Sequence, residues 1–476
     1  MIEVDSAFRK PLELALHGAL QYLESLDSAP VAASANAQTL RSRMNKPLQS
    51  SGIRADCVVE ELLADVSDGI TGSGGGRFFA WVMGGSLPAA LAAEWLTAAW
   101  DQNAAQFTSA PAAAVAEEVA GEWLKQLLGL PATASFAFVT GCQMAHATCL
   151  AAARHALLAR IGYDAEERGL YGAPEIRIIT STAHHGSLTR AMRLLGMGSS
   201  HIIALSAGVG GRLDADTLHE ALHAAQDSPV IVVLQAGDIN TGVFDDFATL
   251  VPLAHEHGAW AHVDGAFGLW AAASPSYRHL TNGASDADSW ATDGHKLLNV
   301  PYDNGYAFVR DSASHCAAMF APAPYIPIAD DGRNAMMWNP EWSRRARGFA
   351  TYAALRELGR DGIADLVDRC CTYAHAITTR IAALDGAQLL WEPVFNQGLV
   401  RFIDPYGTSE EQNDRYTDAA IEEITQSGEA FFGGTTWRGR RAMRVSVCNW
   451  QTTQHDVERT VQAVAQVLKR RRTASR

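Results

Sequence analysis

The sequence predicts an α/β protein built on a mostly parallel β-sheet that is covered by helices on both faces. From about residue 111 to residue 310, short β-like runs alternate with helical stretches rich in Ala and Leu. Near residue 340 the pattern changes, and a long helix leads into a second lobe. The chain has 476 residues, more than one hydrophobic core usually serves, so at least two lobes are expected.

The N-terminal part of the chain, residues 1–75, is expected to be helical. Apolar residues recur at helical spacing over 10–26, where Pro11 suits the first turn of a helix. A linker rich in Ala and Ser follows at 28–38, and a second helical stretch covers roughly 57–66.

A glycine patch at 72–77 could suggest a dinucleotide-binding loop. No β-like run leads into this patch, and Arg77 stands where the third glycine of a G-x-G-x-x-G motif would fall. A dinucleotide fingerprint requires both features, so we do not assign one here.

Residues 76–340 are expected to form the large domain around the sheet. The helices predicted here cover 113–128 and 145–158. The predicted strands cover 135–139, 176–180, 202–205, 230–234, 259–263 and 305–309. Strands that alternate with helices favour a parallel sheet, in which ligands gather at the carboxyl ends of the strands.

Residues 341–476 are expected to form a smaller α+β domain. Its predicted helices cover 343–356, 362–384, 410–427 and 454–470, and its predicted strands cover 398–402 and 443–447. We find no internal repeat in the chain.

Charge and hydropathy argue against two classes of partner. The chain carries 38 basic and 52 acidic residues, a net charge of −14, which disfavours a protein that binds nucleic acid or anionic membranes through a basic face. The sequence contains no uninterrupted apolar stretch of the roughly 18 residues that a membrane-spanning helix needs.

The cysteines indicate a reduced, cytoplasmic protein. Their number is seven, and no two are arranged as Cys-x-x-Cys, so neither a disulfide framework nor a zinc site is expected. His255 and His257 could suggest a metal, but they precede Gly258 and are better explained as a helix end. The N-terminus lacks the pattern of a secretory signal peptide.

Two charged residues in the middle of the chain point to cofactor chemistry. Asp264 ends the apolar run 259–263, and Lys296 closes the sequence Asp293-Gly294-His295-Lys296. A lysine amine can form a Schiff base with the aldehyde of pyridoxal 5'-phosphate. An aspartate can keep the pyridine nitrogen protonated, so that the ring accepts an electron pair. The pair therefore predicts an enzyme that uses pyridoxal phosphate.

A candidate phosphate site lies between the predicted strand 135–139 and the helix 145–158. The turn contains Gly141, Cys142 and Gln143. The N-terminus of a helix offers free N–H groups and the positive end of its dipole to a phosphate. These three residues are the candidate donors.

Other polar groups follow the remaining strands. Either His184 or His185 could lie flat on a pyridine ring, and the stretch 234–242, which includes Asn240, could meet the phenolate oxygen of the cofactor. Ala266 is small enough to lie beneath the ring. No metal is expected at this site.

These motifs resemble those of the group II pyridoxal-phosphate-dependent amino acid decarboxylases, relatives of glutamate and aromatic amino acid decarboxylase. This family belongs to fold type I, the aspartate-aminotransferase-like superfamily. The matching stretches cover most of residues 70–450 and comprise 75–103, 140–150, 185–198, 237–247, 260–267, 287–304 and 432–453.

The resemblance implies a seven-stranded sheet and a role for each matching residue. In the family, the histidine that aligns with His185 stacks on the cofactor, the aspartate that aligns with Asp264 pairs with the ring nitrogen, and the lysine that aligns with Lys296 forms the Schiff base. Asp293 and His295 accompany that lysine. The resemblance also implies a homodimer with the active site at the interface, locked by an N-terminal helical arm.

The chain departs from the family in three places. Cys142-Gln143 stands where the family often has Gly with Ser or Thr, and Asp238-Ile239 stands where a Thr pair often follows Gly237. The family's mobile loop carries a Tyr that protonates the substrate carbon. The corresponding stretch, 325–343, has no Tyr at the expected place before Trp338.

The expected reaction is the decarboxylation of an L-amino acid to an amine and carbon dioxide. Phe78, Phe79 and Trp81 could line the substrate pocket, which would favour an aromatic or bulky side chain, although all three could equally be core residues. Arg444 could bind a substrate carboxylate or could be structural, and Tyr325 could supply the proton.

Other possibilities remain open at the sequence level. The same cofactor supports carbon–carbon lysis, transamination and oxidative deamination. A regulatory protein that binds the cofactor without turnover is a further alternative, against which the intact Lys296 and Asp264 count.

Overall fold

A seven-stranded sheet forms the centre of the large domain in the computed structural model, which describes residues 4–322 and 332–474. The strand order is β1-β7-β6-β5-β4-β2-β3. The strands are β1 Ser135–Val139, β2 Arg177–Ser181, β3 Ile202–Leu205, β4 Val230–Gln235, β5 Trp260–Asp264, β6 Ser289–Asp293 and β7 Gly305–Val309. β7 is antiparallel to both of its neighbours, and the other adjacent pairs are parallel. The prediction of a mostly parallel sheet is confirmed.

β6 is the strand that the residue pattern did not delimit. Its sequence, Ser-Trp-Ala-Thr-Asp, is fully buried between β5 and β7. Because both faces of a central strand are covered, apolar and small polar residues follow one another in it without the alternation that marks a half-buried strand.

Helices cover both faces of the sheet. They are α4 Pro88–Trp100, α5 Pro111–Leu127, α6 Cys142–Arg160, α7 Ala165–Arg168, α8 Gly186–Leu194, α9 Ala215–Ala224, α10 Phe247–Glu256 and α11 Ser312–Met319. Alternate residues of each strand face opposite cores, so Ile231 and Val233 of β4 pack on the side of α6 and α8, whereas Val232 and Leu234 pack on the side of α9 and α10.

One long helix, α12 Gly348–Ala382, connects the two lobes. The sequence predicted two helices here, and Gly359, with φ of 61°, interrupts the helical conformation between them. The helix begins five residues later than predicted because Arg344 is held by other groups. Its guanidinium forms a buried ion pair with Glu117 at 2.6 Å and donates to the carbonyl of Phe138.

The smaller domain is built on a four-stranded antiparallel sheet with the order β10-β11-β9-β8. Its strands are β8 Ala387–Trp391, β9 Gln397–Phe402, β10 Gly433–Trp437 and β11 Arg440–Ser446, and its helices are α13 Glu410–Gln426 and α14 Gln454–Ala474. The domain matches the predicted α+β composition, with two strands more than the sequence indicated.

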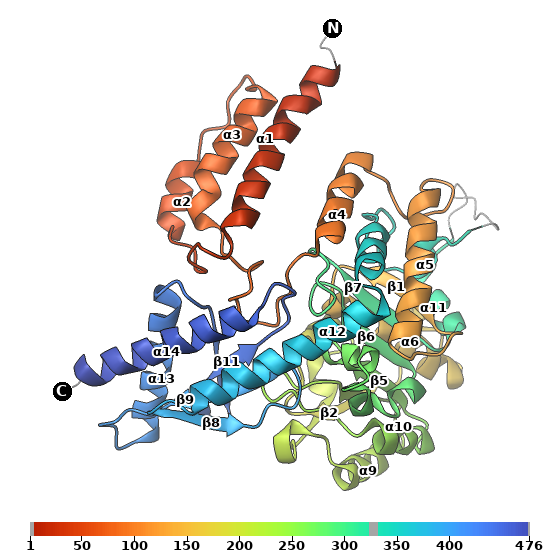
Figure 1. The fold of residues 1–476 in the computed structure, drawn as a ribbon. Helices are drawn as coiled ribbons and strands as arrows, with labels where there is room; N and C mark the ends of the chain where they lie inside the picture. Colours follow the sequence, from red (N-terminus) through yellow and green to blue (C-terminus); the bar gives the residue numbers. More distant parts are fainter. Residues whose placement is uncertain (1–3, 323–331, 475–476) are drawn as a thin grey trace.

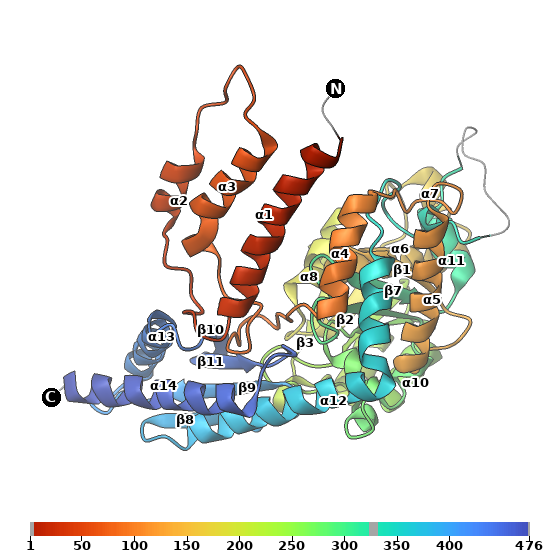
Figure 2. The same cartoon turned by 45° about the horizontal axis from the view of Figure 1, so that its top comes forward.

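The N-terminal helices stand apart from the rest of the molecule in both views (Figures 1 and 2). They are α1 Val4–Ser25, α2 Ala37–Met44 and α3 Ala55–Val66, and we call this group the arm. The expectation that Pro11 lies in a first turn is wrong, because α1 starts at Val4 and places Pro11 inside it. Within the described residues, no helix is both long and apolar enough to cross a membrane.

Candidate active site

A pocket of about 400 Å³ opens at the carboxyl ends of β2, β4, β5 and β6. Nearly all the residues predicted to hold the cofactor line it, and so does Trp81. Those in the lining are Trp81, Gly141, Cys142, Gln143, His185, Asp264, Ala266, Asp293, His295 and Lys296. Residues from distant parts of the sequence converge here because the parallel strands end at one edge of the sheet.

Lys296 and Asp293 form an ion pair at the end of β6. The Nζ of Lys296 lies 3.1 Å from Oδ2 of Asp293. Burial disfavours the charged amine, but the carboxylate of Asp293 outweighs burial and raises the pKa of Lys296 above its ordinary value. The ion pair therefore favours the protonated form of the amine and fixes its position.

The predicted phosphate turn is the N-terminus of α6. The N–H of Cys142 donates to Oδ1 of Asp293 at 2.6 Å, so a carboxylate already satisfies one of the three candidate donors. A Cβ at Gly141 would approach Cε1 of His295 to 3.1 Å. Glycine thus leaves space for an anion between this turn and His295.

Asp264 lies on the inner wall of the pocket. Its Oδ1 accepts the N–H of Ala266 at 3.2 Å, and its Oδ2 lies 3.4 Å from Nε2 of His146. Burial alone would raise the pKa of Asp264, but His146, His185 and Lys296 outweigh burial and hold that pKa below its ordinary value. Asp264 is therefore a carboxylate at neutral pH, as a partner for a protonated pyridine nitrogen must be.

Of the two adjacent histidines, His185 lines the pocket. Its Nδ1 lies 2.8 Å from the Oγ of Ser187 and 3.3 Å from the backbone nitrogen of the same residue, which holds the ring in place. Desolvation by the surrounding protein lowers the pKa of His185, so the ring is neutral at pH 7 and suited to stacking. His184 instead turns back toward β2, where its Nδ1 lies 2.9 Å from the carbonyl oxygen of Ser181.

Gln235, and not Asn240, brings an amide to the pocket. Asn240 is not among the described residues that line it, because its Oδ1 accepts the hydroxyl of Thr435 at 2.9 Å. Gln235 is paired with Asp264 across β4 and β5, and its buried Nε2 has no hydrogen-bond partner among the described residues. A buried donor without a partner is costly, so it indicates a place for an acceptor from a ligand.

Asn299 holds the lysine segment in place and was not identified from the sequence. Its Oδ1 accepts the N–H groups of Gly85 and Trp450, and its Nδ2 donates to the carbonyl of Cys448 at 2.9 Å. The residue adopts a φ of 54°, which non-glycine residues rarely take. One side chain thus links the turn after Lys296 to two other parts of the chain.

Two of the predicted substrate contacts, Phe79 and Arg444, are not among the described residues of the pocket lining. Phe79 is fully buried and stacks on Phe432 with ring centroids 5.3 Å apart, so it belongs to the core. Phe78 is buried in the same way against Phe431. Arg444 is buried beside Asp238 and is not among the described residues of the pocket lining, because its position on β11 directs it toward that carboxylate. Tyr325 lies outside the described residues.

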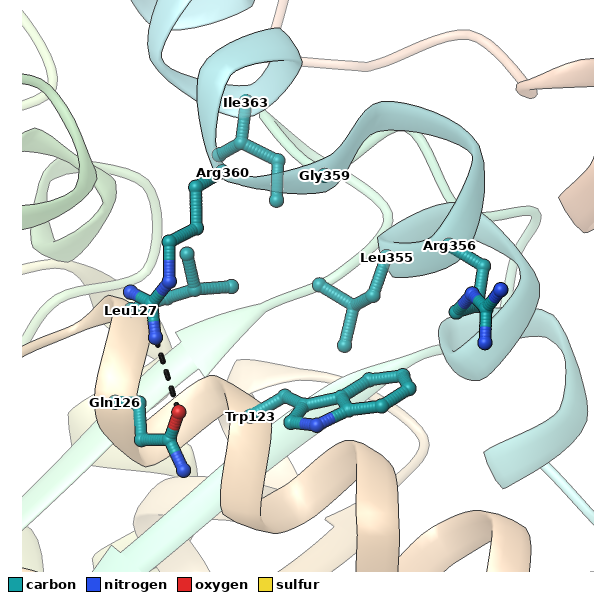
Figure 3. A pocket seen from close by; sticks show the side chains of 8 residues that line it. All are labelled: Trp123, Gln126, Leu127, Leu355, Arg356, Gly359, Arg360 and Ile363. Atoms are coloured by element: carbon teal, nitrogen blue, oxygen red, sulfur yellow. Dashed lines mark hydrogen bonds between the residues drawn. The ribbon is translucent and has the colours of Figure 1, made fainter.

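A second cavity, of about 320 Å³, lies between α5 and α12 near the interruption at Gly359 (Figure 3). Figure 3 shows Trp123 on one side of it, and Arg360 donates to Oε1 of Gln126 at 2.9 Å. The residues that line it include no carboxylate, thiol or lysine. The chemistry of the first cavity therefore makes it the candidate active site.

The residues of the first cavity fit pyridoxal phosphate. A half-buried lysine amine, a buried carboxylate, an amide donor without a described partner and a glycine-bordered helix N-terminus surround one space. The conserved domain of pyridoxal-dependent decarboxylases matches residues 38–403 of the chain.

The chain belongs to the pyridoxal-dependent decarboxylase family. Among curated relatives, the chain is 28% identical over 387 residues to the L-2,4-diaminobutyrate decarboxylase of Rhizobium meliloti, an alignment that covers 80% of this chain and 75% of the relative. It is 25% identical over 450 residues to the aromatic-L-amino-acid decarboxylase of Bacillus atrophaeus, an alignment that covers 92% of this chain and 90% of the relative.

A solved structure shows the same fold over almost the whole chain. Oryza sativa TDC, solved with PLP and tryptamine, superposes with a TM-score of 0.92 at 22% identity and covers 99% of both chains. The predicted fold type I architecture is confirmed. The cofactor of this decarboxylase is pyridoxal phosphate, and the enzyme is a carboxy-lyase.

Proposed function

We propose that this decarboxylase converts an aromatic or bulky L-amino acid into the corresponding amine and carbon dioxide. The observation that carries the proposal is that Lys296 and Asp264 face one pocket, while apolar and aromatic side chains form part of its wall. The amino acid panel described below tests it.

Each polar residue has a distinct task in the proposed reaction. Bound pyridoxal phosphate supplies a ring that accepts the electron pair left behind when the carboxylate departs. Asp264 holds a proton at the ring nitrogen, and the neutral His185 packs on the ring face. Lys296 anchors the cofactor before the substrate arrives. Lys296 itself, or a residue of 325–343, returns a proton to the substrate carbon.

Substrate preference is proposed to come from the outer wall of the pocket. Trp81, Met83, Ile239 and Phe267 line the pocket, and Tyr302 stacks on His295 with centroids 4.2 Å apart. Such a wall favours an apolar ring through burial of apolar area, which contributes roughly 25 cal/mol per Å². Among the described residues of the lining, Lys296 is the only lysine or arginine that could pair with an acidic side chain, and the reaction itself uses it.

A panel of single amino acids, read by release of amine and carbon dioxide, should show the highest kcat/KM for aromatic substrates. Trp81→Ala should lower kcat/KM for the preferred substrate by about tenfold, mainly through KM, because one apolar contact is worth about 1–3 kcal/mol. The kcat/KM of Trp81→Phe should lie between that of Trp81→Ala and that of the wild type. Tyr406→Ala, which removes an exposed ring elsewhere, is the control. A preference for small or acidic amino acids would contradict the proposed specificity.

We also propose that the enzyme is a homodimer whose active site lies at the interface. Exposed apolar side chains recur every fourth residue along α1, at Phe8, Leu12, Leu16 and Leu20. Further exposed rings on α4 include Trp95 and Trp100. Monomeric proteins rarely expose contiguous apolar surface of this kind, and the arm stands free in one chain (Figure 2). A second copy is the occupant that the family resemblance implies.

Charges placed in this stripe should dissociate the dimer. The double variant Leu16→Lys/Leu20→Lys should shift the mass measured by sedimentation velocity from two chains to one and should reduce activity, since each site would lack its partner. His17→Lys/Gln21→Lys adds the same two charges at neighbouring exposed positions of α1 and should stay dimeric. A stripe variant that keeps the wild-type mass would disprove the role of the arm.

The same panel separates the alternative functions. Aldehyde with glycine would indicate carbon–carbon lysis, and a keto acid, or an aldehyde with ammonia, would indicate transamination or oxidative deamination. No turnover with any amino acid, despite a bound cofactor, would favour a regulatory protein.

We place the enzyme in the cytoplasm because all seven cysteines are free thiols. Seven cysteines could have formed up to three disulfides, and none is present among them.

A further inference from the structure

A continuous row of polar contacts runs from Asp264 into the core, away from the pocket, and consists of one charged-group contact to His146 followed by hydrogen bonds. Nε2 of His146 lies 3.4 Å from Oδ2 of Asp264, and Nδ1 of the same ring lies 2.9 Å from Nε2 of His262. Nδ1 of His262 lies 2.8 Å from the Oγ of Ser289, which also accepts the indole N–H of Trp260 at 2.8 Å. We call these four residues, His146, His262, Ser289 and Trp260, the relay.

The strand pattern explains why the relay forms. Trp260, His262 and Asp264 alternate along β5, so their side chains share the face that α6 covers. Ser289 is the residue of β6 that pairs directly with His262. His146 lies one turn after Cys142 in α6, and the sulfur of Cys142 is 3.6 Å from Nε2 of His146.

All four relay residues are buried, with at most 2% of each exposed. Polar groups at such a depth are stable only when each finds a partner. The relay meets this requirement without any group outside the protein, whereas the mechanism described above assigns a task only to Asp264. Neither the packing of apolar side chains nor direct contact with a substrate accounts for the presence of the relay.

The number of available protons determines which group is the donor in each contact of the relay. The indole of Trp260 can only donate. If each imidazole carries one ring proton, four protons are available for four links, and one arrangement fills them all. Trp260 donates to Ser289, Ser289 donates to His262, His262 donates from Nε2 to His146, and His146 donates from Nε2 to Asp264. If His146 donated to His262 instead, Nε2 of His146 would carry a lone pair and would face the carboxylate without a proton to donate.

The groups that face Asp264 come from three other elements. They are His146 and Cys142 from α6, His185 before α8, and Lys296 after β6, with Asp293 beyond Cys142. Burial lowers the pKa of His262 to about 3, so this ring is neutral and carries one proton. Burial raises the pKa of the Cys142 thiol well above its ordinary value, so the sulfur adds no negative charge beside Asp264.

We infer that His146, oriented by His262, Ser289 and Trp260, is a positioning residue that keeps Asp264 ionised and aimed at the cofactor ring. This inference rests on the proposed role of Asp264. His146 supplies the donor, and His262 determines which nitrogen of His146 carries the proton. Loss of either residue weakens the interactions that stabilise the ionised form of the buried Asp264 carboxylate.

The consequence is a change in how cofactor affinity depends on pH. Without His146, burial is opposed by fewer favourable groups, so the pKa of Asp264 moves upward. The carboxylate is present above that pKa and is lost as the pH falls through it. A variant that lacks His146 should therefore bind pyridoxal phosphate with the wild-type Kd near pH 8. At lower pH its Kd should rise relative to wild type, by about tenfold for each pH unit below the raised pKa of Asp264.

The experiment titrates dimeric apoenzyme with pyridoxal phosphate between pH 5 and pH 8. The ratio of variant to wild-type Kd at each pH cancels the titration of the cofactor itself. For His146→Leu the ratio should rise as the pH falls, and for His262→Leu it should rise in the same direction but less. The double variant should match His146→Leu alone, since both act through one contact. His146→Gln, which can donate from its amide, should restore part of the wild-type profile.

His315→Leu is the matched control. This histidine is also fully buried between two hydrogen-bond partners, Ser135 and Trp338, and burial lowers its pKa to about 3. It has no link to Asp264, so its ratio should not vary with pH even if the variant is less stable. Ser289→Ala, a smaller change, replaces His262→Leu if the latter does not fold by near-UV circular dichroism.

A flat ratio for His146→Leu would show that this residue only fills space. The Kd ratio of His146→Leu could rise at low pH while the ratios of His262→Leu and Ser289→Ala do not vary with pH. That result would limit the effect to the direct contact between His146 and Asp264 and would disprove the role of the other relay residues. The titration contains no amino acid. Its outcome is therefore independent of whether the enzyme decarboxylates any substrate, and failure of the proposed function would leave this result readable.

Discussion

Lys296→Ala should abolish turnover while the protein still folds. The lysine anchors the cofactor and is a candidate to return the proton, so its loss should reduce kcat by at least about a thousandfold, or roughly 4 kcal/mol. Its side chain pairs with Asp293 and lines the pocket, so its removal enlarges an existing space and does not open a new cavity in the core. Steady-state kinetics with the best amino acid of the panel measures this effect.

Chemical trapping provides the companion measurement. Borohydride reduction of the wild-type holoenzyme, followed by peptide mass spectrometry, should place the cofactor on Lys296. The other lysines of the chain, Lys10, Lys46, Lys125 and Lys469, should be unmodified. Lys46→Ala, which removes a lysine paired with Glu61 and Asp65 on the arm, should leave both kcat and the adduct unchanged. An adduct on another lysine, or none, would refute the assignment.

Asp264→Ala should lose nearly all activity yet retain much of the fold. An ionised carboxylate beside the ring nitrogen is expected to lower the barrier by several kcal/mol, and each ~1.4 kcal/mol is about tenfold in rate, so kcat should fall at least a hundredfold. Asp264→Asn preserves the shape without the charge and should be similarly impaired. This comparison separates the charge from the space that the side chain fills.

The control for this pair is Asp288→Asn. Asp288 accepts the N–H of Ala261 at 2.7 Å and pairs with His255, just before β6 and therefore at the opposite edge of the sheet. Its replacement should affect stability without a comparable loss of kcat. If Asp264→Asn keeps more than about a tenth of the wild-type kcat, the proposed role of Asp264 is wrong. The pKa of Asp264 is held below its ordinary value, so wild-type activity should not be limited by this group at mildly acidic pH.

The polar residues at strand ends were predictable because their positions depend on local sequence. A buried strand followed by a polar turn is visible in one short window, and parallel strands bring such turns to one edge. Gly141, Cys142, His185, Asp264 and Lys296 were found in this way, and all of them line the pocket. The choice of His185 over His184 required the family resemblance, since the residue pattern treats the two alike.

Contacts that depend on register and on packing between elements were not predictable in the same way. Asn240 and Gln235 lie in one polar stretch, but only Gln235 is paired with Asp264 across the strands. Phe79 and Trp81 are two residues apart, yet Phe79 is in the core and Trp81 lines the pocket. Aromatic residues serve both places equally well, so composition could not distinguish them.

The sequence alone determined the fold class, six of the seven strands of the large sheet and the lysine–aspartate pair, because alternation of strands and helices and the polar strand ends are encoded by neighbouring residues. Only the tertiary structure decided that Gln235 faces the pocket, that Asn299 ties the lysine segment to the smaller domain, and that His146 meets His262 behind Asp264. Each of these contacts joins residues that are distant in the sequence. Their distances follow from strand register and from the way α6 packs on the sheet, which a pattern read along the chain does not contain.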